Sequence, residues 1–358
     1  MSDLNERLAR LDALHRAAIQ IADPSHMLGA EARRVLPQAT GLSPEGVEHA
    51  LRECLEHRAQ RSALSQLARK APETTRAHVL LSANVFVGAF RAIAVALAQS
   101  PRVSVRPSRR EPEMARLLHQ GSGGAFDLVD TLAPRPSEHV WAYGTDATLA
   151  RLRAELPGGV HLHAHGAGLG IAVLGPEALH REVSVEEAAD ALARDMIAFD
   201  QRGCLSPRLA LVDANRPAAE AFARALARAL ARYEERVPRG RLSSDEAADF
   251  LRYRDTMLYA AETLPAGKGL VVLDPVLDRL QVPPVGRVMH VTCVSSVLPH
   301  VEALGSRITS VGIAGHDRLE GLLRAKLGER RYVPLGHMQT PPLDGPTDLR
   351  VGWNAELV

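Results

Sequence analysis

The chain is poor in cysteine, lysine and aromatic residues, the last making up 4% of it. Its three cysteines, Cys54, Cys204 and Cys293, are far apart, which excludes a disulfide framework and a zinc site of paired cysteines. No stretch approaches the roughly 20 apolar residues that cross a bilayer, so we expect no membrane span. The N-terminal segment is amphipathic and does not resemble a secretory signal, so we expect a cytoplasmic protein.

An excess of charge of one sign is also lacking. The 43 basic and 42 acidic residues leave a net charge of +1, so no overall field would attract nucleic acid or an anionic membrane, and we expect neither as a partner. Lys70, Lys268 and Lys326 are the only lysines, so contacts with phosphate are expected to come from arginine.

Strands alternate with helices after an N-terminal helical segment of about seventy residues. From Ala77 onward, short apolar runs such as HVLLSAN, VSVRPS, HVWAYG and LALVD are separated by helical runs of about ten residues or more. This pattern is typical of parallel sheets, which bind ligands at the carboxyl ends of their strands. We therefore expect an α/β protein with two doubly wound domains. The expected parts are residues 1–198 with the N-terminal helices and a nucleotide-binding sheet, 199–335 with the second sheet, and a Pro- and Gly-rich tail at 336–358.

The local context of Cys204 differs from that of the other two cysteines. In DQRGCLSPR it follows a glycine in a turn between a predicted helix and a predicted strand. Backbone N–H groups in such a turn can lower the pKa of a thiol and raise its reactivity. Cys54 lies in a predicted helix and Cys293 in a predicted strand, where packing is the simplest role. Cys204 is the candidate nucleophile, although local context alone leaves a packing role open for it too.

The order of the segments resembles that of a known family. LSANVFVGAF, VSVRPSRREP, AYGTDATLARLRAELPGG, HAHGAGLGIAV and DQRGCLSPR follow one another as in the aldehyde dehydrogenase superfamily, and more closely as in its LuxC-type fatty acyl-CoA reductases. LGSRITSVGIAG and YVPLGHMQTPP also resemble that branch, so the resemblance extends from about Ala77 to Pro342. It implies an aldehyde-dehydrogenase-like fold. It also implies reduction of a fatty acyl-CoA, or another acyl-thioester, to an aldehyde through a thioester on Cys204, with NADPH or NADH as the hydride donor.

The resemblance also implies roles for particular residues. Asn84 matches the asparagine that helps to hold the oxyanion, with a helix N-cap as the alternative role. Arg106 and Ser108 match a Lys-Pro-Ser segment that contacts the adenosine ribose, and the charged fork of arginine would suit a 2′-phosphate, which favours NADPH. Gly144 and Thr145 match a Gly-Ser turn beneath the cofactor pyrophosphate, with an ordinary strand-to-helix turn as the alternative.

The segment HLHAHGAGLG lies where hydrolytic aldehyde dehydrogenases carry a glutamate that activates water. Here no carboxylate occurs between Glu155 and Glu177, as expected of an enzyme that keeps water from its thioester. His165 matches a LuxC-type histidine and is expected to assist proton transfer at Cys204 or to the departing thiol. A structural role for the three histidines of this segment stays open, and we expect no metal site.

Other features depart from the family pattern. Cys204 is followed by Leu-Ser-Pro where the family often has two serines, and the tail lacks a Trp- and His-rich ending. The resemblance further implies a homo-oligomer and an acyl-transferring partner protein. Two alternative functions remain at this point. One is an oxidising aldehyde dehydrogenase, which the missing glutamate argues against, and the other is a non-catalytic or partner-dependent subunit of a biosynthetic complex.

Overall fold

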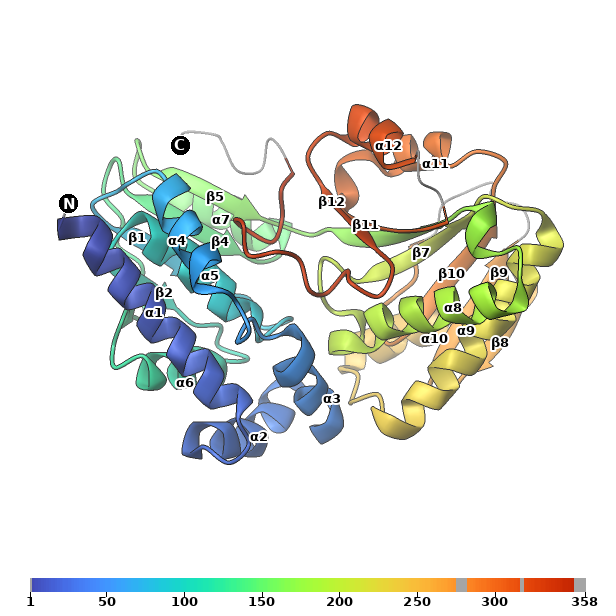
Figure 1. The fold of residues 1–358 in the computed structure, drawn as a ribbon, viewed down its shortest axis with the longest axis horizontal. Coiled ribbons are helices and arrows are strands. Elements are labelled where there is room, and N and C mark those ends of the chain that lie inside the picture. The colour runs from blue at the N-terminus through green and yellow to red at the C-terminus, as the bar shows by residue number, and fades with distance from the viewer. Residues whose placement is uncertain (1, 275–281, 316–318, 351–358) are drawn as a thin grey trace. The chain divides into compact units, whose positions relative to one another are not determined.

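The computed structural model describes residues 2–274, 282–315 and 319–350, and these form two compact units, each built around its own sheet (Figure 1). Unit 1 consists of Met1–Thr40, Val47–Ala167 and Pro342–Val358. Unit 2 consists of Gly41–Gly46 and Gly168–Pro341. Both units have the expected α/β architecture, and the fold class is confirmed. In the described part of the chain, no helix has both the length and the apolar character needed to span a membrane.

Helices of unit 1 form a layer on its sheet. The long α1 (Ser2–Ala22) packs on α5 (Gly88–Gln99) and α6 (Glu113–Gly121), and α5 in turn packs on the strands β1 and β2. Nearly every side chain of α5 is buried, because the helix lies between α1 and the sheet. The other helices of the first 155 residues are α2 (Met27–Thr40), α3 (Pro44–His49), a π-helix (Ala50–Cys54), α4 (Arg61–Lys70) and α7 (Asp146–Glu155).

The sheet of unit 1 is parallel and has the strand order β3-β2-β1-β4-β5. Its strands are β1 (Ala77–Leu80), β2 (Val103–Arg106), β3 (Asp127–Leu128), β4 (His139–Tyr143) and β5 (His161–His165). The direction of strand addition reverses between β1 and β4. In a doubly wound sheet, such a switch point is where ligands bind, beyond the carboxyl ends of the strands.

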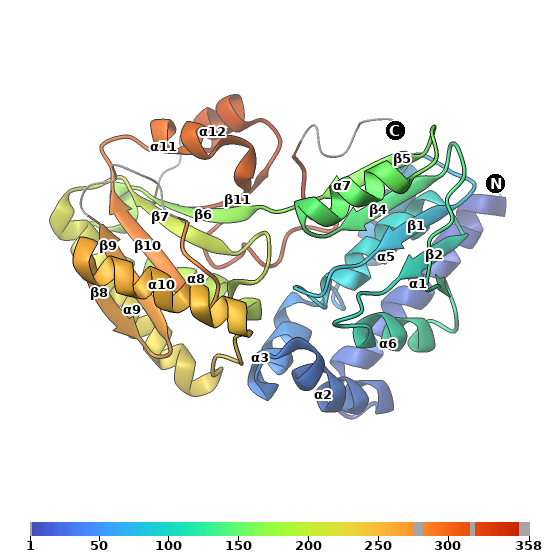
Figure 2. The same ribbon diagram turned by 180° about the vertical axis from the view of Figure 1, so that it is seen from behind.

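The sheet of unit 2 has the order β12-β11-β6-β7-β10-β9-β8 and is parallel except for β8, which pairs antiparallel with β9 at one edge (Figure 2). Its strands are β6 (Leu169–Leu174), β7 (Pro207–Val212), β8 (Glu262–Ala266), β9 (Gly269–Asp274), β10 (Val288–Cys293), β11 (Ile308–Ala314) and β12 (Arg331–Pro334). Its helices are η2 (Pro176–Ala178), α8 (Glu182–Ile197), η3 (Ala198–Gln201), α9 (Arg216–Arg236), α10 (Ser244–Ala260), α11 (Leu298–Leu304), η4 (Gly305–Arg307) and α12 (Leu319–Leu327).

Both faces of this second sheet are buried. On one face, α8 and α9 pack over alternate strand residues such as Ala172, Ala210 and Val291. On the other face, α11 and α12 pack over the intervening residues, among them Ile171 and Leu209. This double cover explains why the central strands read as continuous apolar runs in the sequence.

The limits of the two units differ from those expected. The expected change at residues 198/199 assigned β6 to the first domain, whereas β6 pairs with β7 and β11 in the second sheet and unit 2 resumes at Gly168. Only three residues separate β5 from β6. Such a short connection contains no stretch of linker-like composition that would mark a domain boundary in the sequence. Within the expected tail, residues 342–350 belong to unit 1, and residues 351–358 lie outside the described part.

Candidate active site

The carboxyl edge of the unit 1 sheet gathers all the residues that were expected to bind the cofactor. The register pairs Leu80 with Arg106 and Tyr143 with His165, so the strands end at a common edge. The expected cofactor residues at this edge are half-buried or exposed, which leaves them open to a ligand. They are Arg106 at the end of β2, Ser108 two positions further on, and Gly144 and Thr145 directly after β4.

The turn after β4 begins helix α7. Thr145 is the N-cap, and its hydroxyl accepts a hydrogen bond of 3.3 Å from the Thr148 N–H. The carboxylate of Asp146 accepts from the Ala167 N–H at 2.9 Å. A Cβ atom on Gly144 would meet only Thr148, at an ordinary contact distance of 3.4 Å. The fold itself therefore does not require glycine here, and a glycine would serve the close approach of a ligand to the backbone.

Asn84 is exposed in the bend between β1 and α5. Helix α5 has Val87 as its N-cap, and no side chain caps it. The alternative role of Asn84 as the helix cap is therefore wrong. The exposed amide remains a candidate donor toward a ligand at this edge of the sheet.

His165, the last residue of β5, is buried between aromatic rings and the C-terminal segment of unit 1. Its ring stacks on Tyr143, with centroids 4.6 Å apart and planes at 9°, and lies nearly parallel to Trp141 at 5.7 Å. Neither ring nitrogen has a hydrogen-bond partner among the described residues. Burial lowers the pKa of His165 to about 4, with Asp348 opposing the shift and Arg350 adding to it. The imidazole is therefore neutral near neutral pH.

Residues 342–350 are fastened to unit 1 by two buried guanidinium groups. Arg350 pairs with Asp348 at 2.7 Å and donates to the Ala167 carbonyl at 3.0 Å. Arg91, on α5, forms an ion pair with Glu56 and donates to the carbonyl oxygen of Pro342 at 2.8 Å. Both arginines are almost fully buried, so each N–H group that lost its acceptor would be costly to leave unpaired.

Cys204 lies half-buried in a turn between η3 and β7, as its flanking residues predicted. The Ser206 N–H donates to the Gly203 carbonyl at 3.1 Å, and the Gly170 N–H donates to the Ser206 carbonyl at 3.0 Å. All three cysteines lie in the described parts, and no disulfide joins them. Cys293 ends β10, where its thiol donates to the Ala214 carbonyl at 2.9 Å and burial raises its pKa.

An unusual backbone conformation precedes the Cys204 turn. Phe199, Asp200 and Gln201 have φ angles of 54°, 49° and 64°, in the left-handed region that disfavours residues with a side chain. The apolar spacing of VEEAADALARDMIAFD predicts a helix that continues to Asp200, but α8 ends at Ile197. Each such residue costs on the order of 1–3 kcal/mol and persists only where its surroundings determine it.

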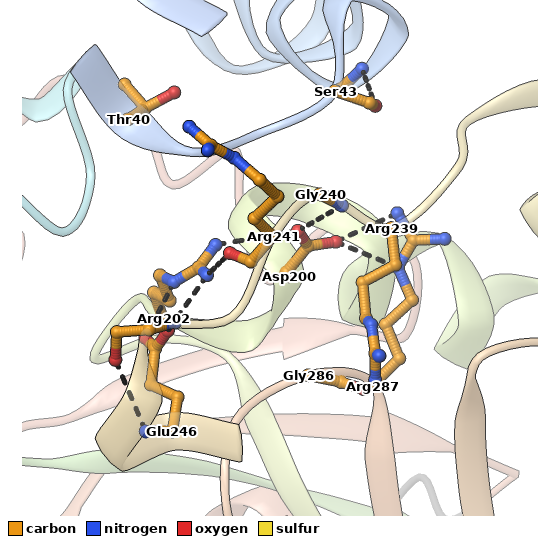
Figure 3. A network of polar contacts seen from close by, with 12 residues as sticks. Thr40, Ser43, Asp200, Arg202, Arg239, Gly240, Arg241, Glu246, Gly286 and Arg287 are labelled. Atoms are coloured by element: carbon orange, nitrogen blue, oxygen red, sulfur yellow. Dashed lines mark hydrogen bonds and ion pairs between the residues drawn. The ribbon is translucent and has the colours of Figure 1, made fainter. Parts of the chain in front are cut away.

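The carboxylate of Asp200 is one of the groups that hold this backbone. It accepts from Arg287 Nε at 2.9 Å and from the Gly240 N–H at 3.0 Å, and the Asp200 carbonyl accepts from the Gly286 N–H at 3.0 Å (Figure 3). Arg202, beside it, forms an ion pair with Glu246 at 2.8 Å (Figure 3). Asp200 and Arg287 are both 1% exposed, so the pair is withdrawn from water and from screening ions.

Gln201 forms the second anchor, and its side chain is fully buried. Its amide nitrogen donates to the carbonyl oxygens of Pro207 and Val288 at 2.8 and 3.0 Å, and its carbonyl accepts from the Val288 N–H at 2.6 Å. Residues 202–206 are therefore a loop whose two ends are joined. Sequence reasoning missed Asp200 and Gln201, because nothing in an ordinary Asp-Gln pair signals a left-handed backbone.

In residues 2–274, 282–315 and 319–350, no group of three or more His, Cys, Asp or Glu side chains has an arrangement that could hold a metal ion.

Comparisons with known proteins agree with this architecture. The family model described as acyl-CoA reductase (LuxC) matches residues 127–349, more than half of the chain. A search of curated proteins by sequence gave no match. Solved structures with a similar fold include an oxidoreductase from Marinobacter aquaeolei, with a TM-score of 0.71 and 13% identity over 92% of this chain and 77% of that one.

Two named dehydrogenases are also similar in fold. Lactaldehyde dehydrogenase from Escherichia coli has a TM-score of 0.68 and 14% identity over 91% of this chain and 78% of that one. An NAD-dependent benzaldehyde dehydrogenase from Corynebacterium glutamicum has a TM-score of 0.66 and 12% identity over 91% of this chain and 81% of that one. The structural likeness establishes the fold, and the family match establishes the enzyme class. The chain belongs to the LuxC family of acyl-CoA reductases and has the fold of the aldehyde dehydrogenases.

Proposed function

We propose that the protein reduces a fatty acyl-CoA, or another acyl-thioester, to an aldehyde with NADPH through a thioester on Cys204. The observation that carries this proposal is the Cys204 loop. The left-handed residues before it are held by the Asp200–Arg287 pair, and its ends are joined by Gln201. Strain maintained next to a thiol in a turn is typical of a functional site.

The reaction proceeds in two stages. The Cys204 thiolate attacks the thioester carbonyl, a new C–S bond forms, and the carrier thiolate leaves and takes up a proton. When bound, the nicotinamide cofactor supplies the hydride that reduces the acyl group. The resulting thiohemiacetal collapses, releases the aldehyde and regenerates the Cys204 thiolate. Covalent catalysis of this kind divides one difficult step into two easier ones.

Asn84 and His165 have proposed roles in these steps. The exposed amide of Asn84 is suited to donate a hydrogen bond to the oxyanion of the tetrahedral intermediates. His165 is neutral and so can accept a proton, but its pKa of about 4 makes it a weak base near neutral pH. Because its ring is buried, exchange of a proton with it requires either a substrate group or a water molecule that reaches the carboxyl end of β5.

The residues at the edge of the unit 1 sheet fit a nicotinamide nucleotide. Arg106 and Ser108 would hold the adenosine ribose, and Gly144 and Thr145, at the N-terminus of α7, would hold the pyrophosphate. The half-buried guanidinium of Arg106 suits a 2′-phosphate, so we assign NADPH as the preferred donor and NADH as the alternative.

Further proposals follow from the family. We propose acyl-CoA or an acyl-carrier thioester as the substrate, an acyl-transferring protein as a partner, a homo-oligomeric state and a cytoplasmic location. An oxidising aldehyde dehydrogenase and a non-catalytic or partner-dependent subunit are the competing functions. The absence of carboxylates between Glu155 and Glu177 supports the reductase over the first of these.

The test is NADPH consumption with a long-chain acyl-CoA and an aldehyde trap. The native protein is compared with Cys204→Ala and with Cys293→Ala, which removes the other thiol of unit 2. We expect trapped aldehyde from the native protein and from Cys293→Ala, and none from Cys204→Ala. Equal turnover of Cys204→Ala and the native protein would overturn the covalent mechanism. No turnover by the native protein with NADPH or NADH, and with CoA or carrier-protein thioesters, would favour the non-catalytic or partner-dependent subunit.

A further inference from the structure

Strand β11 contains an irregularity beside the Cys204 loop. Ile308 pairs with Leu169 and Ser310 pairs with Gly170, so Thr309 is an extra residue between two consecutive pairs. A β-bulge of this kind turns a side chain away from the regular alternation of a strand, and bulges are frequent next to active sites. The direction of the Thr309 side chain is therefore set by a specific local distortion.

The bulge brings the Thr309 hydroxyl to the peptide of the proposed nucleophile. The hydroxyl donates a hydrogen bond to the Cys204 carbonyl, and its oxygen lies 3.1 Å from the Leu169 carbonyl oxygen. Thr309 is fully buried, so water does not compete for these contacts. The hydroxyl has one proton to share between two acceptors, and each acceptor loses a donor if the hydroxyl is removed.

The hydrogen bond to the Cys204 carbonyl restricts the orientation of the whole peptide group, not of the oxygen alone. The peptide unit between Cys204 and Leu205 is planar, so holding its oxygen sets the orientation of the whole group and of the Cys204 backbone attached to it. Gln201 and Gly170 hold the loop at its ends, through Pro207 and Ser206. Thr309 instead holds Cys204 itself, and through it the direction in which the Cα–Cβ bond presents the sulfur.

We propose that Thr309 is a positioning residue for the Cys204 thiol, acting through the hydrogen bond from its hydroxyl to the Cys204 carbonyl. The proposal rests on the proposed role of Cys204 as the nucleophile. It assigns the function to the hydroxyl and not to the methyl group. Two substitutions separate these groups, because Thr309→Val keeps the shape without the hydroxyl and Thr309→Ser keeps the hydroxyl without the methyl group.

The experiment measures two properties of each variant. The first is the rate at which iodoacetamide alkylates Cys204, followed by peptide mass spectrometry across a pH series, with Cys293 as the internal reference for the folding of unit 2. The second is kcat and KM for acyl-CoA reduction. In Thr309→Val we expect Cys204 alkylation to slow at least about tenfold while Cys293 is unchanged, with kcat about 10- to 100-fold lower and KM changed much less. Thr309→Ser should keep rates near those of the native protein.

Two results would overturn the proposal. Native-like Cys204 alkylation and kcat in Thr309→Val would show that the hydroxyl does not position the thiol. Equal losses in Thr309→Val and Thr309→Ser would show that the side chain acts by its shape. Alkylation is independent of the reaction, so if the native protein reduces no thioester, a difference between the two variants at Cys204 still supports the positioning role while the proposed function fails.

Discussion

The side chain of Gln201 donates a hydrogen bond of 2.8 Å to the carbonyl oxygen of Pro207, and this contact joins the two ends of the loop that carries Cys204. The same amide pairs with both backbone groups of Val288, the first residue of β10. One neutral side chain therefore connects the loop to the starts of two neighbouring strands, β7 and β10. The contribution of the Gln201 side chain to the stability of the fold can be measured independently of catalysis.

Gln201→Met should destabilise the protein by about 3 kcal/mol or more. Methionine has a similar volume, but it leaves the Val288 N–H and two carbonyl oxygens buried without their partner, and each unsatisfied group costs roughly 1–3 kcal/mol. Urea unfolding followed by circular dichroism measures the change, with the exposed Gln60→Met as the control. Equal midpoints for the two variants would show that the amide does not hold the loop.

Arg106→Ala should weaken the binding of NADPH about 10- to 100-fold and leave the binding of NADH nearly unchanged. The reason is that a guanidinium contact with a 2′-phosphate is a charge-assisted hydrogen bond, worth about 1.5–3 kcal/mol, and NADH lacks that phosphate. Cofactor fluorescence titration measures both dissociation constants. Arg102→Ala is the matched control, because Arg102 is exposed just before the opposite end of β2. A parallel loss for both cofactors would refute the assignment.

Gly144→Ala should weaken cofactor binding without weakening the fold. The added methyl group meets only Thr148 within the protein, at 3.4 Å, so the thermal unfolding midpoint should stay within about 1–2 °C of the native value. The same methyl group would obstruct a pyrophosphate at the N-terminus of α7. Gly158→Ala, beyond the other end of α7, is the control, because a methyl group added there would meet no atom within 4 Å. Native cofactor affinity in Gly144→Ala would argue against a phosphate site here.

Because of His165, the free energy of unfolding should decrease as the pH is lowered. Its pKa is about 4 in the folded state, below the ordinary value of 6.5, so between pH 6.5 and pH 4 the unfolded chain binds a proton that the folded chain does not. Stability is therefore lost as the pH falls through this window, by about 2 kcal/mol at pH 5 for this one group. His165→Phe, which keeps a ring against Tyr143, should lose correspondingly less stability between pH 7 and pH 5 in urea unfolding. Identical losses in the two proteins would show that the histidine does not titrate in this way.

Much of the fold was accessible from the sequence, because apolar runs and helical periods are local properties. The strands that end at Leu80, Arg106 and Tyr143 were predicted, and so was the turn at Cys204. The sequence did not predict which of the two sheets contains β6, because its pairing with β7 and β11 depends on contacts between residues far apart in the sequence. The family resemblance supplied candidate site residues, but not the groups that support them.

There is a physical reason why the residues that support the Cys204 loop could not be predicted from the sequence. Asp200 and Gln201 have left-handed backbones although neither is glycine, and this conformation is imposed by Arg287 and Val288, which lie more than eighty residues away. Thr309 occupies a bulge inside a run that reads as an ordinary alternating strand. Such features depend on tertiary contacts, and a pattern of residue types carries no trace of them.

The attachment of residues 342–350 to unit 1 has a consequence for the order of events during synthesis. Domains usually fold from the N-terminal end as the chain leaves the ribosome. Here Arg91, made early, can pair at once with Glu56, but it finds its acceptor at Pro342 only after the whole of residues 168–341 has been translated. The contacts of Arg91 with residues 342–350, which complete the first unit, therefore form only after the chain of the second unit has been made.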